Sequence, residues 1–186
     1  MDKQDNFLIN NYLKSEDEKY LEILINKYLK SVYNFIYQYL KNEKDSEDIA
    51  QETFLKAWKN LKKFDQNKNF KTWIFAIAKN TCLDFLKKKK PILLENYKNE
   101  DENNFLENIP DEKESIDIKI NNKILIEKIN TSLNSLPLKY KLVITMHYTE
   151  DLSIEEISEI LKESPNTIKS RLRRGILYLK KELNAP

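Results

Sequence analysis

The sequence predicts an all-α fold: two small helical domains joined by a flexible acidic linker, with a helix-turn-helix in the second domain. Apolar residues recur at helical spacing over most of the chain, and a single glycine leaves few of the tight turns that β-hairpins need. One acidic stretch in the middle loses this periodicity. We therefore expect an N-terminal tail at 1–17, a first domain at 18–90, a linker at 91–117 and a second domain at 118–183.

Composition excludes several classes of protein. One glycine cannot supply a glycine-rich phosphate-binding loop or a dinucleotide fingerprint. One cysteine and one histidine cannot form a disulfide, a cysteine-based zinc site or a histidine-rich metal centre, so we expect no metal and no cofactor. The N-terminus is polar, and no apolar run approaches the ~20 residues of a membrane span. We expect a cytoplasmic protein that does not insert into a membrane.

The formal net charge of +2 is the sum of alternating acidic and basic segments. Residues 56–90 carry a net charge of +9 and residues 161–186 carry +5, whereas 1–55, 91–122 and 123–160 carry −4, −6 and −2. Separated basic segments favour binding to a polyanion, although the lysine run at 87–90 taken alone fits a solvated helix face equally well. All three arginines lie within residues 171–174, and the general richness of the chain in lysine does not explain this clustering.

The first domain shows the apolar spacing of three helices. One covers about 18–40, and a second begins with Asp45 as its N-cap. The inner stripe of this second helix is Ile49, Thr53, Ala57 and Leu61. A polar loop at 65–69 leads into a third helix, which carries Trp73, Ile77, Thr81 and Phe85 at helical spacing and runs to the lysine run and Pro91.

The second domain ends in the pattern of a helix-turn-helix. Ser153, followed three residues later by Glu156, predicts a capping box that begins one helix. Lys162 lies in the expected turn, where many such turns have glycine. Ser164 as N-cap and Pro165 at the first helical position then begin a second helix. Two short helices joined by a tight turn are typical of a motif that enters the DNA major groove.

The outward face of this last helix gathers polar and basic side chains. They are Asn166, Thr167, Ser170, Arg171 and Arg174, with Lys169 and Arg173 on the flanks. Arginine suits bidentate contact with guanine, and we expect Lys169 and Arg173 to reach phosphates instead. The alternative is an ordinary helical hairpin with a basic outer face. The caps, the apolar spacing and the placement of the arginines favour DNA reading.

Three segments together resemble a known family. Residues 45–58, DSEDIAQETFLKAW, resemble the conserved second region of bacterial sigma factors. Residues 70–80, FKTWIFAIAKN, are similar to the segment that follows it, and residues from Leu136 to Leu172 are similar to the fourth region. Their order and the acidic linker between them resemble the small extracytoplasmic-function group of sigma factors, which keeps only these two domains.

The resemblance implies binding to core RNA polymerase and to promoter DNA, and it leaves open an anti-sigma factor as a further partner. The helix at 45–62 would dock on the clamp of the largest polymerase subunit through Asp48, Gln51, Glu52 and Leu55. The loop at 64–71 and the next helix would engage the minus-ten element as it opens, whereas the helix-turn-helix would read the minus-thirty-five element. The minus-ten candidates are Asn67, Asn69, Lys71, Trp73, Lys79, Asn80, Lys87 and Lys88, with a core role as the alternative for Trp73.

The residues give little support to an enzyme. Glu156 and Glu159 lie about one helical turn apart, but solvation of a capped helix explains them better than acid–base chemistry. His147 lacks an evident partner, and Cys82 lies on the inner stripe of its helix. We therefore predict no catalytic residues. The remaining alternatives are a helix-turn-helix regulator that acts without joining core polymerase, and a helical protein-interaction module.

Overall fold

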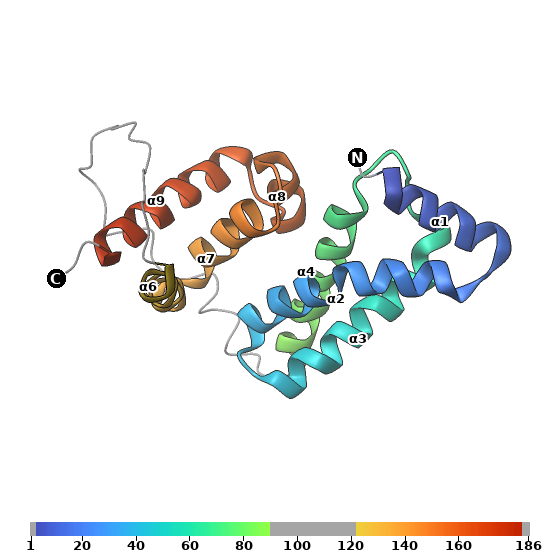
Figure 1. Ribbon diagram of the computed structural model, residues 1–186, viewed down its shortest axis with the longest axis horizontal. Coiled ribbons are helices and arrows are strands. Elements are labelled where there is room, and N and C mark those ends of the chain that lie inside the picture. Colours follow the sequence, from blue (N-terminus) through green and yellow to red (C-terminus); the bar gives the residue numbers. More distant parts are fainter. Residues whose placement is uncertain (1–2, 90–121, 184–186) are drawn as a thin grey trace.

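The computed structural model describes residues 3–89 and 122–183, and every regular element in those ranges is a helix. Figure 1 shows two groups of helices. The first group contains α1 (Lys3–Ser15), α2 (Glu18–Leu40), α3 (Glu43–Asn60), the short η1 (Leu61–Lys63) and α4 (Phe70–Lys89). The second contains α6 (Asn122–Ser135), α7 (Leu138–Ile144), the wide π-helical turn η2 (Thr145–Thr149), α8 (Ile154–Leu161) and α9 (Pro165–Leu183). The predicted all-α fold is confirmed.

The first group packs α2, α3 and α4 around one core. The predicted inner stripe is buried in full: Ile49, Thr53 and Ala57 lie on α3, and Leu61 lies at the start of η1. Helix α4 is apolar over most of its circumference because α2, α3 and α8 all pack against it. Phe75, at its centre, is completely buried. Helix α4 is therefore the central element of the molecule.

Two details of this group differ from the sequence-based expectations. The segment at 1–17, expected to be a tail, contains α1, which buries Leu8 and Ile9 against the core. A helix of this length is marginal in isolation, so packing on α2 stabilises it rather than its own propensity. The N-cap of α3 is Asn42 instead of Asp45, because the side chain of Asn42 accepts the backbone N–H of Asp45 at 2.9 Å, and the helix therefore begins at Glu43.

The second group packs α9 across α7 and α8. Leu136 and Pro137 separate α6 from α7. Gly175, the single glycine, lies where α9 crosses α7: a Cβ added there would come within 2.6 Å of Ile144 Cδ1. The glycine therefore permits a close approach of two helices.

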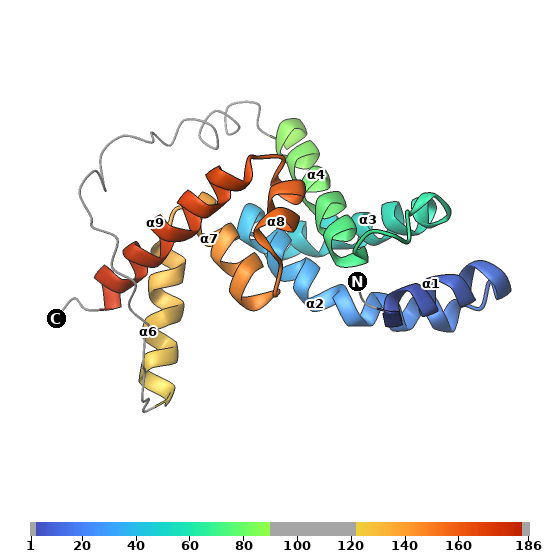
Figure 2. The ribbon, with the colours of Figure 1, turned by 90° about the horizontal axis from the view of Figure 1, so that it is seen from above.

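The two groups touch each other along α4 and α8, and Figure 2 shows α8 lying over the first group. A second contact joins α2 and α7. There Lys141 is buried, its Nζ donates to Asn134 Oδ1 at 2.6 Å, and burial together with the nearby Lys41 lowers its pKa to about 8. The linker expected at 91–117 lies outside the described residues.

Candidate nucleic-acid and polymerase interfaces

The helix-turn-helix is built by the local signals that the sequence carries. Ser153 and Glu156 form the complete capping box at the start of α8. Lys162 ends α8 in the left-handed region, with φ 57°, so the turn forms without glycine. Ser164 Oγ then accepts the backbone N–H of Thr167 at 3.1 Å and caps α9. These contacts fix the angle at which α9 leaves the turn.

The N-terminal half of α9 forms one wall of a hollow of about 260 Å³. Five of the predicted DNA-reading residues line it: Asn166, Thr167, Ser170, Arg171 and Arg174. The flanking Lys169 and Arg173 are exposed beside it. The opposite wall is formed by Lys139 and Tyr140 of α7, which the sequence analysis did not single out. A lysine and a tyrosine shortly after Pro137 do not by themselves indicate that α7 lies opposite α9 and forms the second wall of the hollow.

Arg171 already has a partner inside the second domain. Its guanidinium contacts Glu163 Oε2 at 2.7 Å, and both side chains are partly exposed. Glu163 belongs to the turn, where Ser158 Oγ donates to its backbone carbonyl at 2.5 Å. The ion pair holds the guanidinium beside the turn. Contact between Arg171 and a base therefore requires an exchange of partners.

The loop before α4 is held in shape by its own polar side chains. Asp65 Oδ1 accepts both the backbone N–H and the side-chain amide of Asn67 at 3.0 Å, and Asn67 is exposed. Asn69 Oδ1 accepts the backbone N–H of Lys71 at 2.9 Å and caps the start of α4. The loop thus presents Asn67 outward between two fixed turns.

Trp73 differs from the other minus-ten candidates. Its ring lies 5.0 Å from Phe64 and 5.5 Å from Phe70, measured between ring centroids. Phe64 and Phe70 lie on either side of the loop at 65–69, so the half-buried indole that packs against both of them stabilises the two ends of the loop. The geometry favours the core role and argues against Trp73 as a stacking platform for a base.

Three of the minus-ten candidates are covered by the second domain. Lys71 Nζ contacts both the backbone carbonyl of Glu150, at 2.5 Å, and its carboxylate, at 2.9 Å. Lys79 Nζ donates to the carbonyl of Leu161 at 2.8 Å, at the negative end of the α8 dipole. Burial lowers the pKa of Lys79, the nearby Lys162 lowers it further, and Glu163 opposes them.

Glu156 is the third point of contact between the domains. One carboxylate oxygen accepts the backbone N–H of Ser153 at 2.8 Å within the capping box. The other accepts Asn69 Nδ2 at 2.6 Å and Thr72 Oγ1 at 3.3 Å, both from the first domain. Burial raises the pKa of Glu156, but these hydrogen bonds outweigh it and leave the pKa below its ordinary value. The charged carboxylate thus caps α8 and joins the domains at once.

The other minus-ten candidates lie in the open. Asn80 is exposed on α4. Lys87 and Lys88 are exposed in its last turn, and Lys89 pairs with Asp45 at 2.6 Å. The predicted set is therefore divided: Asn69, Lys71 and Lys79 face the second domain, whereas Asn67, Asn80, Lys87 and Lys88 face solvent.

A broad apolar groove of about 950 Å³ runs between α2 and α3. Of the predicted polymerase-binding residues, Gln51 and Leu55 line it, whereas Asp48 and Glu52 are exposed on α3 outside the lining. Leu55 and Trp58 from α3 are 49% and 43% exposed, and they face Leu29 of α2, which is 45% exposed. The α2 wall of the groove is not predictable from the sequence, because the exposed apolar residues of the two helices form one surface only after the helices pack.

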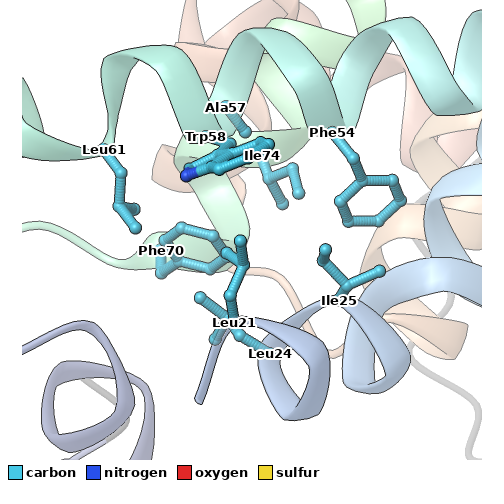
Figure 3. A pocket seen from close by; sticks show the side chains of 9 residues that line it. All are labelled: Leu21, Leu24, Ile25, Phe54, Ala57, Trp58, Leu61, Phe70 and Ile74. Carbon is cyan, nitrogen blue, oxygen red and sulfur yellow. The ribbon is translucent and has the colours of Figure 1, made fainter. Parts of the chain in front are cut away.

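Figure 3 shows the inner end of this groove, where a small cavity of about 10 Å³ reaches the core. Phe54 and Trp58 from α3 point toward Leu21 and Ile25 from α2. Ile74 of α4 lies behind them. The indole N–H of Trp58 donates to the hydroxyl of Tyr12, so α1 helps to hold the indole, which lines both the small cavity and the groove.

The described residues offer no second kind of site. No group of three or more potential metal ligands occurs in 3–89 or 122–183. Cys82 is buried, and burial raises the pKa of its thiol to about 12. His147 is half-buried, with Nδ1 2.9 Å from the carbonyl of Leu152. Within the same ranges, no helix has the length and apolar character of a membrane span.

Comparison with known proteins identifies the family. A family model described as sigma-70 region 2 matches residues 24–92, and one described as sigma-70 region 4 matches residues 126–179. The chain is 33% identical over 178 residues to the ECF RNA polymerase sigma factor SigW of Bacillus subtilis, covering 92% of each chain. It is 29% identical over 173 residues to SigV of the same organism, covering 91% of this chain and 95% of that protein.

Solved structures show the same fold. The structure of CnrH in complex with the cytosolic domain of CnrY matches with a TM-score of 0.65 and 19% identity over 98% of both chains. The sigma factor RpoE of Bartonella quintana, in complex with the anti-sigma factor NepR, matches with a TM-score of 0.63 and 22% identity over 89% of this chain and 97% of that one. The chain therefore belongs to the extracytoplasmic-function group of the sigma-70 family, the sigma factors that direct RNA polymerase to promoters.

Proposed function

We propose that this sigma factor divides promoter recognition among three surfaces. The recognition helix α9 reads the minus-thirty-five element, the loop before α4 together with α4 engages the minus-ten element, and the groove between α2 and α3 holds core polymerase. The observation that carries the proposal is the hollow beside α9, where arginine, asparagine, serine and threonine side chains converge on one open face. Sigma factors of this family are non-enzymatic regulators of transcription.

The minus-thirty-five surface has the chemistry of direct readout. Ser170, Arg171 and Arg174 line the hollow from α9, and the guanidinium of Arg171 becomes available to a base once it leaves Glu163. Guanidinium groups can bind O6 and N7 of guanine together, which discriminates among bases in the major groove. The exposed Lys169 and Arg173 lie where they can bind the flanking phosphates and fix the helix in register.

The minus-ten surface works in two stages in this proposal. Asn67, Asn80, Lys87 and Lys88 are accessible to DNA in the arrangement described. Asn69, Lys71 and Lys79 become accessible only when the second domain moves off α4. Lysines at the end of α4 would bind the backbone by counterion release, and the polar loop would hold unstacked bases as the duplex opens.

The polymerase surface combines an apolar floor with a polar rim. Leu29, Leu55 and Trp58 supply exposed apolar area, and Asp48 and Gln51 supply polar groups on α3. This composition is typical of a protein interface with a hydrophobic core. We propose that it docks on the clamp of the largest polymerase subunit, with Glu52 at the edge in its ion pair with Lys56.

The remaining proposals concern organisation and partners. We place the first domain at 18–90 with α1 added to it, and the second at 118–183. We propose that the protein works in the cytoplasm and performs no catalytic step of its own. An anti-sigma factor is a further proposed partner, because RpoE was solved with one and shares this fold.

Run-off transcription tests the proposed function. Purified core RNA polymerase is incubated with this protein on fragments of the host genome, and transcript starts are mapped. We expect a set of starts that share two upstream elements and that vanish when the protein is omitted. Arg174→Ala should weaken use of the upstream element, and Asn67→Ala should weaken use of the element near the start. Transcripts with random starts would contradict the proposal.

A further inference from the structure

We propose that α1 is a positioning element for promoter recognition, and that Asn6 and Asn10 on its inner side set the conformation of the minus-ten loop through Gln66. Asn6 Nδ2 donates to the backbone carbonyl of Gln66 at 3.0 Å. Gln66 Nε2 donates to Asn10 Oδ1 at 2.8 Å. Both bonds link residues more than fifty positions apart in the sequence, so they join α1 to the loop rather than stabilising either alone.

Helix α1 is itself rigidly anchored to the first domain. The carboxylate of Asp5 is almost fully buried; it accepts a hydrogen bond from Tyr28 at 2.5 Å and pairs with Lys27 at 2.6 Å. Leu8 and Ile9 are buried in the core. A buried carboxylate with two partners fixes the helix along its length and about its axis. The inner face of α1 is therefore a fixed surface to which the loop is hydrogen-bonded.

The loop has few other supports at its middle. Its two ends are held by the aromatic cluster of Phe64, Phe70 and Trp73. Asp65 and Asn67 bond only to each other and to backbone groups within the loop in the contacts seen here. Gln66 lies between them and carries both bonds to α1. Removing these bonds leaves the internal bonds of the turn between Asp65 and Asn67 intact, but it lets the turn that presents Asn67 shift relative to α1 while the ends of the loop stay in place.

The inference rests on the proposed role of the loop at the minus-ten element and adds to it the residues that position the loop. Neither Asn6 nor Asn10 is placed among the DNA-contacting residues. Both are half-buried against the loop, and they act through Gln66. A positioning residue of this kind should alter which bases the loop selects, with little effect on how strongly the upstream element is bound.

The test uses the full chain with core polymerase and promoter templates recovered by run-off transcription. Each template is compared with single-base variants in the minus-ten element and in the minus-thirty-five element. Asn6→Leu keeps the size of the side chain, removes the donor and leaves the charge unchanged; leucine also favours helix more than asparagine does. Asn11→Leu is the matched control, because the side-chain amide of Asn11 donates to the backbone carbonyl of Phe7 within α1 rather than to the loop. Thermal melting checks that all variants are folded.

We expect Asn6→Leu to reduce minus-ten base discrimination by about three- to tenfold, the effect of losing one hydrogen bond. Minus-thirty-five discrimination should not change, and Asn11→Leu should behave like the unaltered protein. Asn10→Leu should have a similar effect, and this effect should disappear in a Gln66→Met background, because the bond it removes is then already absent.

Two failures are distinguishable through the Asn67→Ala variant. If Asn67→Ala weakens minus-ten discrimination but Asn6→Leu and Asn10→Leu do not, the positioning role of α1 is refuted and the proposed function stands. If Asn67→Ala also leaves discrimination intact, the loop does not read the element, and both proposals fall together.

Discussion

The contact between the domains should hold the free protein closed, and breaking it should expose the minus-ten surface. The double variant Glu150→Gln with Glu156→Gln removes both charges that the second domain places against Asn69 and Lys71. Glutamine can still complete the capping box with Ser153, so α8 stays intact. When its oxygen accepts the Ser153 N–H, however, the side-chain NH2 of the glutamine at position 156 faces the NH2 of Asn69, and two donors cannot form a hydrogen bond.

The magnitude follows from the exposure of the groups. The side chains of Lys71 and Glu150 are 23% and 10% exposed, so solvent only partly screens their ion pair. We assign about 1 kcal/mol to each altered contact, or about 2 kcal/mol together. This corresponds to a shift of roughly 30-fold in the closed-to-open equilibrium. The Lys68–Glu159 pair, exposed on both sides, should contribute little.

Small-angle scattering and fluorescence anisotropy measure the two consequences. The radius of gyration of the free double variant should increase, and its affinity for a labelled single strand carrying the minus-ten sequence should increase by up to about 30-fold. The control is Asp151→Asn together with Glu155→Gln, because this pair makes the same charge change at two exposed positions of the second domain. If the double variant matches this control in both measurements, the contacts do not hold the domains together and the reasoning is wrong.

Three further predictions follow from the same structure. Arg174→Ala should cost about 1–3 kcal/mol in affinity for the preferred minus-thirty-five duplex, whereas Lys169→Ala should weaken all duplexes alike and reduce the salt dependence; gel-shift titrations with holoenzyme distinguish the two. Asp48→Lys should abolish co-elution with core polymerase in size-exclusion chromatography while leaving the melting temperature unchanged. Because the pKa of Lys141 is about 8 in the folded chain, the folded chain loses this proton at a lower pH than the unfolded chain does. Lys141 should therefore add about 1–3 kcal/mol to the free energy of unfolding between pH 7 and pH 10. Chemical denaturation should show this as a difference between the unaltered protein and Lys141→Met, because the raised pKa of Cys82 acts in the opposite direction in both.

Much of the fold could be predicted because its signals are local. The capping box of Ser153 and Glu156, and the Ser164 cap followed by Pro165, depend only on residues a few positions apart. The buried stripe of α3 follows from helical spacing alone. The predicted N-cap of α3 was wrong by three residues because Asn42 and Asp45 are both good caps, and the hydrogen bond from the Asp45 N–H to the Asn42 side chain, which decides between them, is not visible in the sequence.

The parts that could not be predicted depend on contacts between distant residues. Helix α1 has several asparagines, and its stability comes from the pairing of Asp5 with Lys27 and Tyr28, more than twenty positions away. Lys71 and Lys79 were predicted to contact DNA from their residue type and their position in the sequence. Their contacts with Glu150 and Leu161 join segments about eighty residues apart. Only the packed structure shows that these candidates are covered.

Under the proposed role of Lys71 and Lys79 at the minus-ten element, covering them should also change how the protein distributes itself between DNA and polymerase. Each cation withheld from phosphates lowers the affinity for arbitrary DNA, and a genome offers roughly 10⁶–10⁹ such competing sites. A smaller fraction of a closed sigma factor should therefore be bound nonspecifically to chromosomal DNA. A larger share of newly made copies stays free to meet core polymerase, so promoter output should follow the number of copies more closely than it would for a permanently open form.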